Sequence, residues 1–175
     1  DTLVTDNSFS LSSSQVYHVS VRAIDAVGNT SAPVSTDGIV ADHEGPFGSN
    51  AVDGDSIDIE RQNIIDLYSG HWVLFTDDLS GLMTHEYALY DTTDLIYVSG
   101  WGSAGLDTAA VISDLNLTPD HLYQLHVRGV DQVHNTGGLI SSNGVLIDLS
   151  APEAPQDLLG FFSTERIYLT WSANT

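Results

Sequence analysis

Apolar and polar side chains alternate along several short stretches of this chain. In the clearest of them, Tyr17, Val19 and Val21 are separated by polar residues. A period of two places these apolar side chains on one face of a β-strand. A turn over 25–29 that contains Asp, Gly and Asn follows, and then a second apolar run to about Val40. This order predicts a β-hairpin.

The middle of the chain contains further short stretches with the composition of strands. Segments rich in Asp, Ser and Gly separate them, as turns do. No stretch combines a 3.6-residue period with helix caps. Strands are therefore expected at 71–75, 84–90, 95–101 and 109–115. Their number and spacing predict an all-β fold, a two-sheet antiparallel sandwich with Trp72 and Tyr123 in its core.

The chain repeats itself. Residues 1–46 align with 107–152 without a gap at an offset of 106 (107 − 1), and 14 positions are identical. The pairs that carry the match include Asp25 with Asp131 and Asn29 with Asn135. A period of this size is that of whole domains rather than of solenoid turns.

The repeat divides the chain into three expected units. Residues 1–45 are the second half of one sandwich domain, 46–151 are a complete domain, and 152–175 are the first strands of another. The chain opens at Asp1 rather than Met and stops inside a strand-like stretch, so we expect it to be a piece of a longer protein. Each partial unit would expose an apolar face and an unpaired sheet edge on its own.

The repeated stretch resembles a known family. Tyr17-x-Val-x-Val-Arg-Ala-x-Asp-x-x-Gly-Asn-x-Ser and its copy from Tyr123 are similar to the F strand and F–G turn of fibronectin type III and related Ig-like modules. Residues 151–173 resemble strands A and B, and the run from Trp72 to Gly81 is similar to the B–C region. The second copy departs from the pattern at His134, which stands where the turn glycine is expected.

The resemblance implies a setting and a role. Such modules occur in tandem in secreted and cell-surface proteins, where they act as spacers, adhesive units or appendages of enzymes. It therefore implies an extracellular or cell-surface location. The partners expected from it are neighbouring modules or copies of the same protein, together with surface glycans or proteins.

The charge excludes several function classes. The chain has 24 Asp plus Glu against 4 Lys plus Arg, a formal net charge of −20. No basic surface is left to bind nucleic acid or anionic lipid. All four cations are arginines, so Schiff-base and P-loop lysines are impossible, and the absence of cysteine removes disulfides and thiolate metal sites. The sequence contains no run of 18 apolar residues, so we expect no membrane insertion of this segment.

Catalytic signatures are missing from the sequence, so we expect no enzyme activity in these residues. Ser103 follows Trp101-Gly102 and does not complete a G-x-S-x-G elbow. The run 53–58 begins like an EF-hand loop, but Ile57 stands where an oxygen ligand is required. Most of the seven histidines alternate with apolar residues on expected strands, and the histidines are interpreted as side chains on the solvent face of strands.

The acidic residues suggest a metal site. In an Ig-like topology the B–C and F–G loops lie at the pole where the chain enters, so five carboxylates are expected to converge there. These are Asp42, Glu44, Asp77, Asp78 and Asp131. Calcium, a hard cation that prefers oxygen ligands, would relieve their repulsion. The alternative is that Asp simply favours turns and that a saline habitat selects an acidic surface.

Two function classes remain open. The first is a non-catalytic structural or adhesive array, a spacer, filament or surface fibre stiffened by calcium at its junctions. The second is an accessory region, carbohydrate-binding or spacer, of a secreted polysaccharide-degrading enzyme. Sugar binding would depend on Trp101, because Trp72 is expected in the core, and it would need a planar row of two or three exposed aromatic rings. The partial units lead us to expect an elongated assembly.

Overall fold

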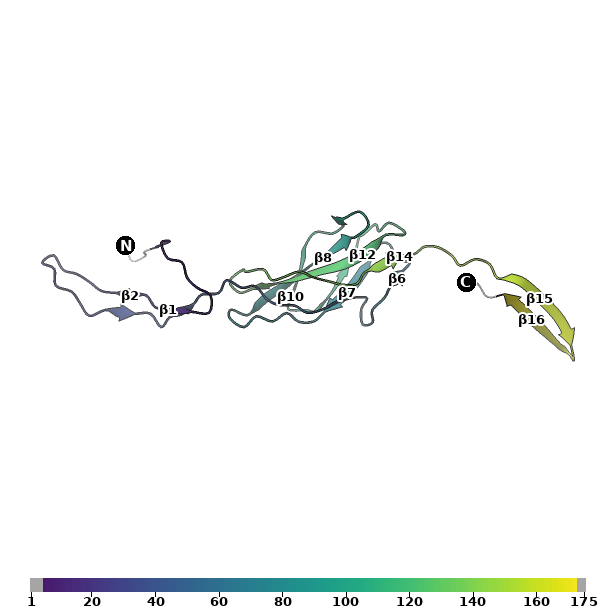
Figure 1. Cartoon of the computed structure of the whole chain (residues 1–175), viewed down its shortest axis with the longest axis horizontal. Helices are drawn as coiled ribbons and strands as arrows, with labels where there is room; N and C mark the ends of the chain where they lie inside the picture. The colour runs from purple at the N-terminus through teal and green to yellow at the C-terminus, as the bar shows by residue number, and fades with distance from the viewer. Residues whose placement is uncertain (1–4, 173–175) are drawn as a thin grey trace.

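The computed structural model describes residues 5–172, and this range contains β-strands and no helix. Strands between residues 51 and 147 form a two-layer sandwich (Figure 1). A segment with two pairs of short strands precedes the sandwich and a separate hairpin follows it, at opposite ends of the view in Figure 1. Residues 1–4 and 173–175, the outermost parts of the first and third expected units, lie outside the described residues.

The larger sheet has the strand order β10-β8-β12-β14-β6, with β9 beside β8 and β13 beside β12. Its strands are β6 (Arg61–Gln62), β8 (Leu82–Asp91), β9 (Ile96–Tyr97), β10 (Gly102–Gly105), β12 (Leu122–Asp131), β13 (Ile140–Ser141) and β14 (Val145–Ile147). Its pairs are antiparallel except for β14 with β6. The two long strands β8 and β12 therefore decide what each face of this sheet presents.

The smaller sheet has the order β11-β7-β5 and is antiparallel. Its strands are β5 (Ala51–Asp53), β7 (Tyr68–Trp72) and β11 (Ala109–Ile112). The layers approach closely at Gly70, because a Cβ atom there would lie 2.7 Å from Cδ2 of Leu125 on β12. A larger residue at this point would push the two sheets apart.

The core lies between the two sheets. Tyr123, Leu125 and Val127 alternate along β12 toward the inside and are buried, and Tyr68 and Trp72 of β7 are buried opposite them. Each such side chain contributes roughly 1.5–3 kcal/mol when it leaves water. The predicted all-β fold with Trp72 and Tyr123 in the core of one complete sandwich is confirmed.

The observed strands differ in their bounds from the expected ones: 84–90 lies within the longer β8, 109–115 is shortened to β11, and the other two differ more. β7 covers 68–72 instead of 71–75, because its pairing with β5 ends at Trp72. The stretch 95–101 is not one strand. β9 is only two residues long, and the backbone N–H of Leu89 donates to the hydroxyl of Ser99 instead of to a ladder carbonyl, which ends the pairing before β10.

Two histidines contradict the expectation that all histidines face solvent. His85 and His126 are both buried. His85 points into the core, where Trp72 and Phe75 meet its ring edge to face at 5.6 and 5.4 Å. Burial lowers the pKa of both histidines. The period-two pattern did not show which face of β8 would be covered.

The segment before the sandwich repeats the register of the sandwich itself. Its strands are β1 (Val16–Tyr17), β2 (Ser20–Val21), β3 (Val34–Ser35) and β4 (Ile39–Val40). Tyr17 pairs with Ile39 as Tyr123 pairs with Val145, at the same offset of 106. Val21 is 68% exposed, whereas its counterpart Val127 is fully buried. The apolar face of this unit is therefore uncovered, as its partial content of strands predicts.

The hairpin after the sandwich pairs β15 (Gln156–Ser163) with β16 (Arg166–Ser172). Phe161 and Tyr168 stack across the two strands with ring centroids 5.1 Å apart. All residues of both strands are exposed, and Trp171 is 59% exposed. This hairpin also has apolar side chains with no layer packed over them among the described residues.

Replacing Trp72 with Ala is expected to destabilise the sandwich by about 3–5 kcal/mol, because it removes buried surface and leaves a cavity. Urea unfolding followed by circular dichroism measures the change. Trp171→Ala is the matched control and is expected to change the free energy of unfolding by less than about 0.5 kcal/mol. Equal effects of the two substitutions would contradict the assigned core.

Candidate functional site

The linker before the sandwich is held by one side chain. The amide Nδ2 of Asn135, in the turn after β12, donates to the backbone carbonyls of Asp42 at 3.2 Å and Glu44 at 3.3 Å. The linker backbone also lies against Gly137, where a Cβ atom would overlap the carbonyl oxygen of Pro46. The chain therefore enters the sandwich along a fixed path that needs glycine at position 137.

Asn135 is itself positioned by Asp131. One carboxylate oxygen of Asp131 accepts the backbone N–H groups of Val133 at 2.9 Å and Asn135 at 2.7 Å, and the other accepts Asn135 Nδ2 at 2.8 Å. Burial acts to raise the pKa of Asp131, but these hydrogen bonds outweigh it and hold the pKa below its usual value. The carboxylate is therefore charged at neutral pH, as a metal ligand must be.

Two more carboxylates join Asp131. Asp77, in the loop after β7, accepts the backbone N–H groups of Leu79, Ser80 and Gly81 with one oxygen. Asp42 accepts the N–H of Ser80 at 3.2 Å. One oxygen from each of Asp42, Asp77 and Asp131 lies within 4.8 Å of the others. The structure thus brings together three of the five residues that the sequence singles out.

Glu44 and Asp78 lie beside this cluster without joining it. Both are exposed, and both line a hollow of about 270 Å³ together with Asp77. Asp78 follows Asp77 directly and belongs to the same loop. Three carboxylates at about 5 Å repel one another by several kcal/mol when partly buried. The arrangement offers oxygen ligands of the kind that calcium takes, with room for more at the exposed side.

A second group of possible ligands lies at the opposite end of β8 and β12. It consists of Asp91, Asp94 and His121, and Nδ1 of His121 is 2.8 Å from a carboxylate oxygen of Asp91. The hydrogen bond to Asp91 raises the pKa of His121. Because the buried carboxylate already has this partner, the pair is explained as a hydrogen bond that ties the two strand ends. The sequence pattern did not predict the pairing of Asp91 with His121, since this pairing depends on the register between β8 and β12.

The sequence motifs that resemble active sites have structural roles. Asp53 is buried and accepts hydrogen bonds from the Tyr68 hydroxyl and the Gly144 N–H, and burial raises its pKa. The hydroxyl of Ser103 shares a hydrogen bond with Thr84, which is not a general base. Neither residue is arranged for chemistry in the described part of the chain.

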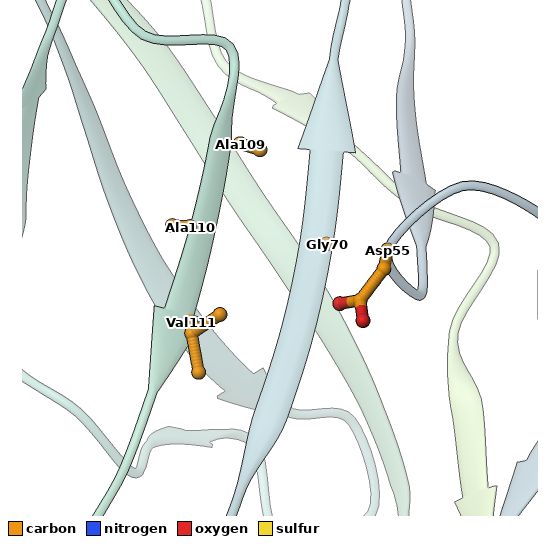
Figure 2. A pocket seen from close by; sticks show the side chains of 5 residues that line it. All are labelled: Asp55, Gly70, Ala109, Ala110 and Val111. Carbon is orange, nitrogen blue, oxygen red and sulfur yellow. The ribbon is translucent and has the colours of Figure 1, made fainter.

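A shallow hollow of about 300 Å³ lies on the smaller sheet (Figure 2). Figure 2 shows Ala109, Ala110 and Val111 on β11, Gly70 on β7, and the carboxylate of Asp55 beside β7. Small apolar side chains and one carboxylate give this hollow no converging polar groups. It is not a candidate for ligand binding.

The outer face of the larger sheet is aromatic. Arg128 of β12 pairs with Glu86 of β8 at 2.8 Å, as expected for an arginine lying along a sheet, and its guanidinium lies 4.2 Å from the ring centroid of Trp101. Tyr97 lies 5.6 Å from Trp101, but the two ring planes are tilted by 50°. The planar row of rings that flat sugar surfaces would need is therefore not formed by these two residues.

Comparisons with known proteins give limited likenesses. The chain is similar to Exoglucanase B of Cellulomonas fimi, with 28% identity over 172 residues, which is 94% of this chain and 15% of that protein. It is also similar to the FN1-FN3 domains of chicken CNTN1, with 16% identity, a TM-score of 0.43, and coverage of 91% of this chain and 53% of that one. A comparison with models of known protein families finds no match. The chain therefore spans a minor part of the curated relative.

The described residues include no helix that is long and apolar enough to cross a membrane.

Replacing Asn135 with Ala is expected to destabilise the sandwich by about 1–3 kcal/mol, because the Asp42 and Glu44 carbonyls and the Asp131 carboxylate lose their donor. Hydrogen exchange of the linker amides at 42–47 should speed up in the same variant. Asn29→Ala is the matched control, since Asn29 occupies the same repeat position and bonds to Asp25 within its own turn. Unchanged linker exchange in Asn135→Ala would show that the linker does not depend on this side chain.

Proposed function

We propose that this chain is a non-catalytic structural or adhesive spacer segment of an extracellular or cell-surface multidomain protein. The observation that supports this most is the linker path, which Asn135 and Gly137 fix against the sandwich. A fixed linker between repeats of 106 residues sets a constant spacing and orientation between modules. A flexible linker would give reach without stiffness.

The uncovered apolar faces of the two end units favour an elongated assembly. Val19 and Val21 before the sandwich, and Phe162 and Ile167 after it, are more than half exposed. Exposed apolar faces of this kind are covered by neighbouring modules or by further copies of the chain. Head-to-tail covering propagates into a filament unless it closes a ring.

In solution this 175-residue chain is expected to form elongated oligomers, because association removes the apolar faces of the end units from water. Multi-angle light scattering coupled to small-angle X-ray scattering measures mass and shape as concentration rises. The pair Val21→Asp and Ile167→Asp, one on each end unit, should reduce the mass. A compact, monodisperse monomer at every concentration would contradict the assembly.

We also propose that calcium binds at the junction through Asp42, Asp77 and Asp131, with Glu44 and Asp78 supplying outer ligands. The charged state of Asp131 and the 4.8 Å grouping support this. A bound divalent ion would cancel the repulsion among the carboxylates and tie the linker to two loops. It would therefore stiffen the junction.

Calcium is expected to raise the melting temperature, since an ion that binds only the folded state contributes about 2.7 kcal/mol at a hundredfold excess over its Kd. Thermal unfolding in EDTA is compared with millimolar CaCl2 at matched ionic strength in NaCl. Asp42→Asn should remove the calcium effect, whereas Asp114→Asn, an exposed aspartate that belongs to neither group of possible ligands, should keep it. Equal stabilisation by NaCl alone would leave only charge screening and would end the calcium proposal.

A second candidate function is an accessory region of a secreted polysaccharide-degrading enzyme. The likeness to Exoglucanase B over 94% of this chain favours it, although the match covers only 15% of that protein. The sequence of the gene on both sides of this segment separates the two candidates. Further copies of the 106-residue unit support the array, and an adjoining catalytic domain supports the accessory role.

A further inference from the structure

The solvent side of the larger sheet presents an unusual surface. Sheets that face water on one side usually place polar residues there. In this sandwich Tyr90, Tyr97, Trp101 and His126 lie together on that side, and we call these four residues the aromatic face. They come from β8, from β9, from the turn before β10 and from β12.

The four rings form one connected group. Tyr90 and His126 are stacked with centroids 4.8 Å apart and planes 16° apart. Tyr97 meets Tyr90 edge to face at 5.0 Å, and its hydroxyl lies 3.0 Å from Nδ1 of His126. Tyr97 in turn lies 5.6 Å from Trp101. These contacts hold the rings in a fixed geometry, so little side-chain entropy would be lost on binding a ligand.

Part of the aromatic face is open to solvent. Tyr97 is 45% exposed and Trp101 is 36% exposed, while His126 is buried beneath them. Leu95 and Ile96, next to Tyr97, are also exposed, and Leu95 has a φ of 60°, which a leucine rarely adopts. A strained turn that displays apolar side chains beside exposed rings is typical of an interaction surface.

The charges beside the rings define the ligand that fits. Arg128 and Glu86 are paired at 2.8 Å next to Trp101, so the surface carries donors and acceptors but little local net charge. The whole chain carries −20 and repels polyanions. Because the Arg128 guanidinium lies over the Trp101 ring, 4.2 Å from its centroid, it covers one face of the indole. We propose that the aromatic face binds a neutral polysaccharide, with sugar rings packed on Tyr97 and on the exposed part of Trp101 and hydroxyls bonded to Arg128 and Glu86.

The ring geometry selects the form of the polysaccharide. The planes of Tyr97 and Trp101 differ by 50°, so two sugar rings that stack on them cannot lie in one plane. A single soluble chain twists between successive units and fits this arrangement, whereas the flat surface of a crystalline polymer does not. This proposal rests on the second candidate function, because an accessory region of a polysaccharide-degrading enzyme would meet such a glycan. It adds to that function the class of polysaccharide that is bound.

Affinity electrophoresis of the whole chain in gels that contain a soluble neutral mixed-linkage β-glucan tests the site. The wild type should be retarded, and carboxymethyl cellulose and microcrystalline cellulose should bind it far more weakly. Trp101→Ala and Tyr97→Ala should each raise the apparent Kd by on the order of tenfold. Trp101→Phe, which keeps a ring, should stay within a few-fold of the wild type.

Trp171→Ala is the matched control, because Trp171 is an exposed tryptophan outside the aromatic face, and it should bind like the wild type. The melting temperature of each variant shows whether the sandwich is intact, and Trp101→Phe keeps the test valid if Trp101→Ala unfolds. No retardation of the wild type, equal binding by Trp101→Ala, or binding to microcrystalline cellulose alone would overturn the proposal. If the chain binds no glycan but a catalytic domain adjoins it in the full protein, the glycan site is wrong and the accessory role is still supported.

Discussion

The hydrogen bonds from the Asn135 side chain to the linker carbonyls are the interaction on which the rest of the junction depends. They work because Asp131 holds Asn135 with one carboxylate oxygen while the other organises the turn. The linker can then run against Gly137, and Asp42 comes within reach of Asp77 and Asp131. The Ser80 N–H, which lies within hydrogen-bond distance of both Asp42 and Asp77, is a second contact that holds the carboxylates together against the repulsion of their charges.

The hydrogen bonds between Asp131 and Asn135 occur in both copies of the repeat. Asp25 and Asn29 reproduce the same bonds, with Asn29 Nδ2 2.8 Å from the carboxylate of Asp25. One counterpart differs, because Ser31 stands at the repeat position of Gly137, where a Cβ atom would overlap the carbonyl oxygen of Pro46. The hydrogen bonds of the turn are thus the same in both copies, whereas the residue that lies against the linker in the sandwich differs.

The strands β8 and β12 give the sandwich two different surfaces. Leu125 and Val127 of β12 face the core, whereas His126, one of the four rings of the aromatic face, and Arg128, beside Trp101, face the other way. The same alternation that builds the core therefore also fixes the rings of the aromatic face on the outer side of the larger sheet.

Sequence reasoning predicted the fold and part of the junction, and its failures have physical reasons. Period-two alternation, the repeat and the buried Trp72 were enough for an all-β sandwich, and the loop topology was enough to bring Asp42 to Asp77 and Asp131. Which neighbour points inward in a loop depends on local hydrogen bonds, so Glu44 and Asp78 could not be separated from the other three. The burial of His126 under Tyr97, and the pairing of Asp91 with His121, depend on strand register, which the alternation leaves undetermined.

The hydrogen bonds of Asn135 hold the linker at one position on the sandwich. The chain has no cysteine, so two engineered ones can carry spin labels without interference. Labels at His43→Cys in the linker and Ser113→Cys after β11, both exposed positions, report the distance between linker and sandwich by pulsed electron paramagnetic resonance. We expect one narrow distance distribution, which broadens when Asn135 is replaced by Ala. A broad distribution in the chain with Asn135 intact would contradict it.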